Sequence, residues 1–185
     1  MADPSYIVDG VLTDSEAWVG ISTATSSGST ATFTFTSTDD GQVGDFSQYM
    51  DLVLIFYVNS TGSYSKLNFN NDTGSNYAYQ NLYGNGANDY AGSGAATYFD
   101  GAWYNNTTKF GSAIVHLFDI NSGKYKSGIT QVASDADGSG NVALTATTWK
   151  SQAPITEIDI IDAGTANFLN GSTVSLFGIL PRMVA

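Results

Sequence analysis

Short runs of alternating apolar and polar residues, separated by clusters of glycine, asparagine and aspartate, recur along this chain of 185 residues. In residues 29–37, STATFTFTS, Ala31, Phe33 and Phe35 occupy one side and threonines the other. This period of two predicts a strand with one buried and one solvated face. Residues 50–59, MDLVLIFYVN, are apolar on both sides, which predicts a central strand.

Similar runs continue to the end of the chain. They begin at Tyr64, Asn76, Ala96, Ser112, Lys124, Asn141, Pro154 and Ser172, and turn-forming clusters begin at Asp39, Asn71, Gly84, Asn121, Asp135 and Asn170. This spacing predicts about eight to eleven short antiparallel strands. Strong helix formers are scarce, whereas Thr, Ser, Gly, Asn and aromatic residues are abundant. We therefore expect an all-β fold, an antiparallel two-sheet sandwich of jelly-roll type.

The first sixteen residues differ from the rest, because Pro4, Asp9, Gly10 and Asp14 interrupt the apolar side chains. We interpret residues 1–16 as an N-terminal arm and residues 17–185 as a single sandwich domain. The candidate partner contacts in the arm are Tyr6, Ile7, Val8, Val11 and Leu12. An exposed apolar arm favours packing on a neighbouring subunit or another protein, and the alternative is an arm lying along its own sandwich.

The composition excludes several classes of function. With 17 acidic and 6 basic residues, the net charge is −11, so no basic surface is expected for nucleic acid. Without cysteine and with one histidine, zinc and thiol chemistry are excluded, and no cofactor is predicted. No apolar run approaches the ~20 residues of a membrane span, and the start lacks the pattern of a signal peptide. We expect a soluble chain made in the cytoplasm, with no membrane partner.

No catalytic constellation stands out, and we predict that the chain is not an enzyme. His116 lies in a predicted strand, with Asp119 on the opposite face, which favours a hydrogen-bonded structural histidine at a sheet edge or subunit contact over a catalytic base. Glu157 and Asp159 share one strand face, but nothing selects them as a glycosidase pair. Most aspartates occupy turn positions, where they bond the local backbone.

The segment from Asp135 to Asn141 partly resembles a calcium loop. Oxygen-bearing side chains recur at alternate positions, with Gly140 at the sharp turn. Ala146, however, stands where the bidentate glutamate belongs, and strand patterns flank the segment. A Gly-rich hairpin turn is the favoured interpretation, and a bound calcium ion is the alternative.

Aromatic residues crowd the middle of the chain among Asn, Gly and Asp: Tyr77, Tyr79, Tyr83, Tyr90, Tyr98, Phe99, Trp103 and Tyr104. Aromatic faces stack on sugar rings while neighbouring polar groups bond hydroxyls. The candidate glycan contacts are Tyr90, Trp103 and Tyr104. The alternative, cross-strand aromatic pairs that stabilise the sandwich, is favoured.

Several strings occur in an order that resembles small virion structural proteins of tailed phages, especially marine ones. They are residues 67–77 (LNFNNDTGSNY), 82–86 (LYGNG), 49–54 (YMDLVL), 123–127 (GKYKS), the Gly-rich turn leading to Trp149, 153–158 (APITEI) and 175–179 (SLFGI). The resemblance covers residues 28–180, with Phe177 where the group has tyrosine, and it offers no catalytic residues.

The resemblance implies a structural component of the virion, assembled in the host cytoplasm. A compact acidic domain with an arm suits a decoration or cement protein bound to the major capsid protein on the head surface, because negative charge repels packaged DNA. By analogy, such a protein is expected to be a homotrimer. The alternative is a tail or head fibre protein that binds host glycans through the aromatic segment.

Overall fold

The computed structural model describes residues 18–103, 109–135, 139–164 and 166–180, together with the backbone of residues 7–8 and 11–12. All twelve strands that build the two large sheets are antiparallel to their neighbours, which confirms the predicted all-β sandwich. Besides the strands, the described part contains one 3-10 turn, η1 (Phe46–Gln48), capped by the Asp45 carboxylate.

The larger sheet has eight strands. In spatial order they are β3 (Trp18–Thr25), β14 (Thr173–Ile179), β5 (Asp51–Val58), β10 (Gly111–Phe118), β11 (Lys126–Asp135), β12 (Gly140–Trp149), β7 (Tyr77–Gly84) and β8 (Asp89–Ala96). The smaller sheet has four, in the order β4 (Thr32–Thr36), β13 (Glu157–Asp162), β6 (Tyr64–Phe69) and β9 (Phe99–Trp103). From β3 to β7 every connection changes sheet, which is the crossing pattern of a jelly roll.

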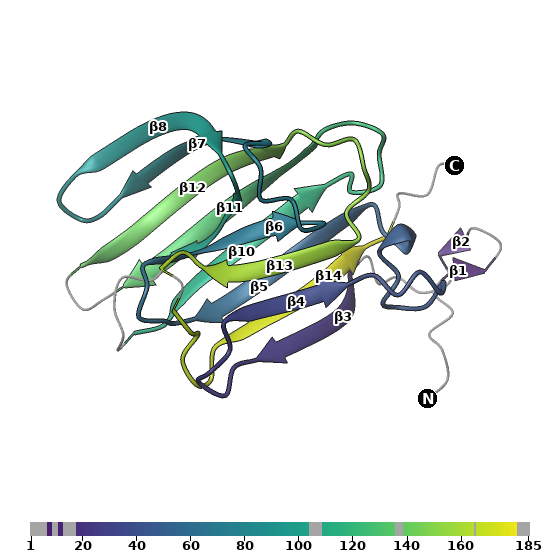
Figure 1. The fold of residues 1–185 in the computed structure, drawn as a ribbon, viewed down its shortest axis with the longest axis horizontal. Helices are drawn as coiled ribbons and strands as arrows, with labels where there is room; N and C mark the ends of the chain where they lie inside the picture. The colour runs from purple at the N-terminus through teal and green to yellow at the C-terminus, as the bar shows by residue number, and fades with distance from the viewer. Residues whose placement is uncertain are drawn as a thin grey trace.

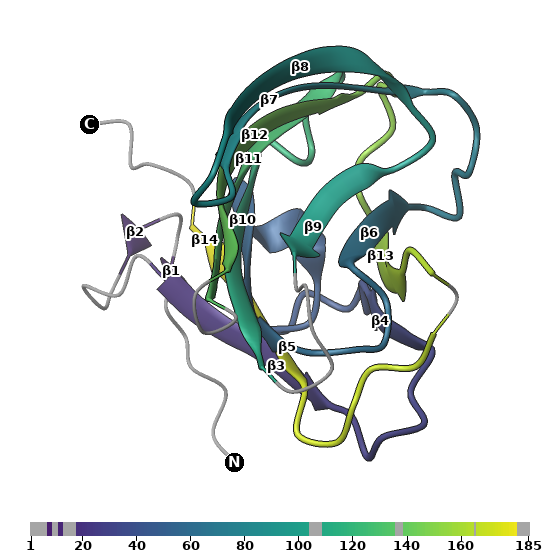
Figure 2. The same ribbon diagram turned by 90° about the vertical axis from the view of Figure 1, so that its left-hand side faces the viewer.

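The larger sheet curves around the smaller one, and β7 and β8 extend over β9 (Figure 2). The core fills the space between the sheets, because alternate residues of both sheets point inward. Fully or nearly fully buried members include Phe33, Leu52, Leu54, Phe56, Leu67, Phe69, Phe99, Val115, Leu117, Ile158, Ile160 and Phe168. Strand β4 shows the predicted alternation, with Phe33 and Phe35 buried and the threonines exposed.

Two strands were not expected from the sequence. Strand β8 (Asp89–Ala96) is rich in glycine and alanine, and β3 (Trp18–Thr25) lacks a clean alternation. Each forms one edge of the larger sheet, where a strand pairs with a single neighbour. Neither strand has a clear alternation of apolar and polar residues. Each is instead held in the sheet by its hydrogen-bonded pairing with a neighbour that has one, β8 with β7 and β3 with β14.

At the N-terminus, β1 (Ile7–Val8) and β2 (Val11–Leu12) form a two-stranded antiparallel hairpin, with Ile7 opposite Leu12 and Val8 opposite Val11. In Figure 1 this hairpin stands apart from the two main sheets. Tyr6 and all side chains of the predicted arm lie outside the described residues. Whether the arm contacts a partner stays a prediction.

Candidate functional site

The outer face of the eight-stranded sheet carries a continuous row of aligned residues. The strand register places them opposite one another in the order Ser175, Ile55, Ile114, Gln131, Leu144, Leu82 and Ala91. Directly opposed residues of an antiparallel pair point to the same face. The row thus crosses seven strands from β14 to β8, and four of its members are large aliphatic side chains.

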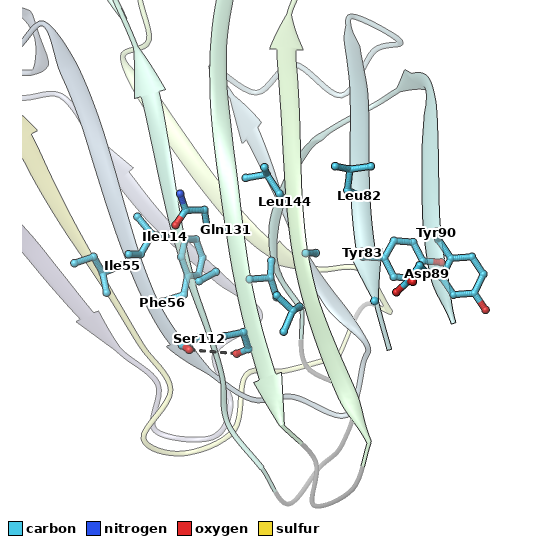
Figure 3. A pocket seen from close by; sticks show the side chains of 16 residues that line it. Ile55, Phe56, Leu82, Tyr83, Asp89, Tyr90, Ser112, Ile114, Gln131 and Leu144 are labelled. Carbon is cyan, nitrogen blue, oxygen red and sulfur yellow. Dashed lines mark hydrogen bonds between the residues drawn. The ribbon is translucent and has the colours of Figure 1, made fainter. Parts of the chain in front are cut away.

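These aliphatic side chains are exposed although they are apolar. Leu82 is 59% exposed, Leu144 46%, Ile114 44% and Ile55 40%, and the adjacent Val142 is 71% exposed. A hollow of about 950 Å³ lies over them, with Ser112, Gln131 and Ala133 also in its lining (Figure 3). An apolar surface of this kind is a frequent site of protein–protein contact. We call it the outer apolar face, defined by Ile55, Leu82, Ile114, Val142 and Leu144.

The central strand β5 explains why this face was missed from the sequence. Its pattern was interpreted as burial on both sides, and Leu52, Val53, Leu54 and Phe56 are indeed buried. Ile55 and Tyr57, however, project from the outer side and are exposed. Hydrophobicity reports that a side chain avoids water, but it does not distinguish a core from a surface that a partner covers.

Charge is absent from the middle of this face. Two acidic residues lie at outward-facing positions on strands β5, β10, β11, β12 and β7. Asp51 is the first residue of β5, and Asp135 is the last residue of β11. Between them, these positions carry no Lys, Arg, Asp or Glu. Within the described lining of the hollow, Asp89 of the edge strand β8 is the charged residue, so a docking molecule meets a fixed charge only at that margin.

His116 is held by a hydrogen bond, which agrees with the predicted structural histidine. Its Nε2 lies 2.9 Å from Asp51 Oδ2, and its ring stacks on Phe118 with centroids 4.1 Å apart. The other oxygen of Asp51 accepts the backbone N–H of Asp119 at 2.8 Å. The histidine lies on β10 in the interior of the sheet rather than at an edge. The pair fastens the end of β10 to β5.

The carboxylates considered as a glycosidase pair are engaged by neighbouring side chains. Asp159 Oδ1 accepts the Thr34 hydroxyl at 2.6 Å, and Glu157 accepts hydrogen bonds from Thr36 and Asn71. Among the described residues, no three His, Cys, Asp or Glu side chains gather as a metal site. The candidate calcium loop includes residues 136–138, which lie outside the described part, so that hypothesis is unchanged.

The structure brings two of the three predicted glycan contacts together. Tyr90 of β8 stacks on Tyr83 of β7 at a centroid distance of 4.6 Å, and Trp103 of β9 meets the same ring edge-on at 5.0 Å. Tyr104, the third candidate, lies outside the described residues. Tyr83 is the ring that both Tyr90 and Trp103 contact, although the sequence indicates it only as one of several aromatic residues in this region. We call Tyr83, Tyr90 and Trp103 the aromatic cluster.

Strand β9, which carries Trp103 of the aromatic cluster, also carries a buried carboxylate. This residue is Asp100, the second residue of β9, and it is 8% exposed. Burial raises the pKa of its carboxyl above the usual range, and the Thr145 hydroxyl acts in the opposite direction. Burial also raises the pKa of Tyr98, whose hydroxyl lies 3.1 Å from that of Tyr64.

Comparisons with known proteins identify no relative: no family model, no curated protein and no solved structure matches the chain. Among the described residues there is also no helix long and apolar enough to cross a membrane.

Proposed function

We propose that this chain is a non-enzymatic structural protein of a phage particle, a decoration or cement protein that binds the major capsid protein on the head surface. The outer apolar face carries the proposal. It is a broad, exposed apolar surface on the eight-stranded sheet, and its central strand positions carry no charged side chain. The resemblance of the sequence to virion structural proteins supports the same role.

A rigid sheet suits this task because its side chains are already ordered before docking. Burying a fully exposed leucine or isoleucine contributes about 1.5–3 kcal/mol. The side chains of this face are already about half covered, so each contributes correspondingly less, and the cost of association reduces the total further. The remaining surface is acidic, which keeps copies soluble and disfavours contact with packaged DNA. The proposed partner of the outer apolar face is therefore the shell protein, and a homotrimer remains the expected assembly.

Labelling of intact virions tests the location. An antibody raised against the purified chain, with a gold conjugate, is expected to mark the head surface in electron micrographs. Label confined to the tail tip would overturn the capsid role and favour the alternative, a fibre protein that binds host glycans.

A pair of variants tests the docking surface. Leu144→Asp places a charge in the middle of the outer apolar face and is expected to abolish co-sedimentation with particles that lack the protein. Thr32→Asp adds the same charge at an exposed position of β4, on the other sheet, and should leave binding unchanged. Thermal unfolding must show that both variants fold. Equal binding by the Leu144 variant and the wild type would exclude this face.

A further inference from the structure

A second hollow lies at the end of the sandwich, where the β7–β8 hairpin extends over β9 (Figure 2). Its volume is about 490 Å³, within the range of small-molecule sites. The start of β6, the end of β7, the end of β9 and the start of β12 contribute to its lining. Tyr64, Tyr83 and Trp103 supply aromatic surface, and Asn85 and Asn141 supply amides.

The central ring of this site is fixed before any ligand arrives. Tyr83 is stacked on Tyr90 with an interplanar angle of 19°, and the Trp103 ring meets it at 69°. A ring held from two directions loses little conformational freedom on binding. Such preorganised aromatic surface is suited to a flat, weakly polar partner such as the face of a sugar ring.

Hydrogen-bond donors accompany the rings. Trp103 Nε1 is buried and has no hydrogen-bond partner within the described part of the chain. The Asn85 Oδ1 atom accepts the backbone N–H groups of Ala87 and Asn88 at 3.1 and 2.8 Å, which orients the side chain and leaves its Nδ2 out of those bonds. A buried donor without a partner, such as Trp103 Nε1, is rare in native proteins, and a ligand oxygen is one way to satisfy it.

Among the described residues, the lining of this hollow has no charged side chain, which restricts the class of ligand. None of these residues offers a cation to a phosphate or carboxylate. A smaller hollow of about 270 Å³ shares Asn85, Ser139, Gly140 and Asn141 with the hollow of about 490 Å³. Asp135 also contributes to the lining of the smaller one. The carboxylate of Asp135 adds a negative charge beside these hollows, which disfavours an anionic ligand.

We propose that this site binds a neutral oligosaccharide, with Tyr64, Tyr83 and Trp103 as its aromatic lining and with Trp103 and Asn85 as hydrogen-bond donors. The proposal does not rest on the capsid role. Leu82 and Tyr83 are consecutive residues of β7 and point to opposite faces of the sheet. The two surfaces nevertheless meet at this end of the sheet, because Val142 of the outer apolar face also lines the smaller hollow and Tyr83 also lines the hollow over that face.

Calorimetric titration of the full chain tests this site. The probes are neutral hexasaccharides of glucose, mannose and N-acetylglucosamine, with hexagalacturonate as the charged comparison. At least one neutral probe is expected to bind, and hexagalacturonate at least tenfold more weakly. Absence of binding by every neutral probe at millimolar concentration, or equal binding of hexagalacturonate, would overturn the proposal.

Matched variants locate the binding. Trp103→Phe keeps an aromatic ring against Tyr83 but removes the indole N–H, and it should weaken binding about tenfold, as expected for one hydrogen bond. Trp18→Phe makes the same change at an exposed position of β3 and should have no effect. Asn85→Asp keeps the acceptor of the turn and removes the donor, so it provides the test if Trp103→Phe does not fold. Unchanged affinity in a folded Trp103 or Asn85 variant would contradict the assignment.

Discussion

The indole Nε1 of Trp149 donates a hydrogen bond to Asp72 Oδ2 at 2.7 Å, across 77 residues of sequence. The contact joins the end of β12 to the turn between β6 and β7. Asp72 also accepts hydrogen bonds from the backbone N–H of Gly74 at 2.9 Å and from the Asn76 amide at 3.0 Å. Burial alone would raise the pKa of Asp72, but these donors outweigh it, and the pKa is lowered.

Trp149→Phe removes the indole donor, and loss of this hydrogen bond should cost about 1 kcal/mol of the free energy of unfolding at pH 7, a value discounted because Asp72 is partly exposed. The smaller ring at this buried position adds a packing loss that does not depend on pH. The lowered pKa means that the stabilisation is present above the ordinary value of 3.8 and is lost as pH falls through the folded pKa. Urea unfolding of both proteins at pH 7 and at pH 2.5 measures the difference. A gap of the same size at both pH values would show that ring packing, rather than the hydrogen bond, is responsible.

Tyr77→Phe is expected to destabilise the fold by about 1–3 kcal/mol, because the buried backbone N–H of Phe69 loses its acceptor. The Tyr77 hydroxyl donates to the carbonyl of Asp72 at 2.9 Å and accepts the backbone N–H of Phe69 at 3.1 Å. The ring is fully buried, and burial raises the pKa of the phenol to about 12. Tyr125→Phe, at a ring that is 59% exposed, serves as the control in the same unfolding measurement. Equal effects of the two changes would contradict a specific role for the Tyr77 hydroxyl.

Asp100→Asn should stabilise the protein at neutral pH. Burial raises the folded pKa of Asp100, so the folded state binds more protons than the unfolded state between 3.8 and the folded value. Stability therefore falls as pH rises through that window, because a charge must then be kept in a buried place. The amide removes this loss, and the difference in melting temperature between variant and wild type should grow from pH 4 to pH 7. A difference that is constant over this range would contradict the mechanism.

Gly178→Ala is expected to cost about 1–3 kcal/mol through overpacking. A Cβ at this position of β14 would overlap the ring of Tyr49, which is buried and whose hydroxyl donates to the Val43 carbonyl at 2.8 Å. Gly123→Ala meets no atom within 4 Å and should change stability by less than about 0.5 kcal/mol. Thermal unfolding of both variants makes the comparison, and similar losses in the two would argue against the steric explanation.

Much of the architecture was predictable from local patterns. The alternation in β4 identified its buried phenylalanines, and the Asn- and Asp-rich clusters identified turns, as the positive φ angles of Asp39 and Asn71 confirm. These signals are local, because alternation and a left-handed backbone are properties of adjacent residues. Strand β8 was missed for the same reason, since glycine and alanine carry no alternation to detect.

The sequence by itself determined the all-β class, the positions of most strands and turns, and the absence of cysteine chemistry. Only the tertiary structure decided which apolar residues remain outside the core, and which distant aromatic side chains meet. Ile55 and Leu82 are 27 residues apart in the chain yet share one row, because four intervening strand pairings place them there. Tyr83 and Trp103 meet because β7 and β9 belong to different sheets that pack together. A hydrophobic pattern records which residues avoid water, but the order and register of strands determine where those residues come together.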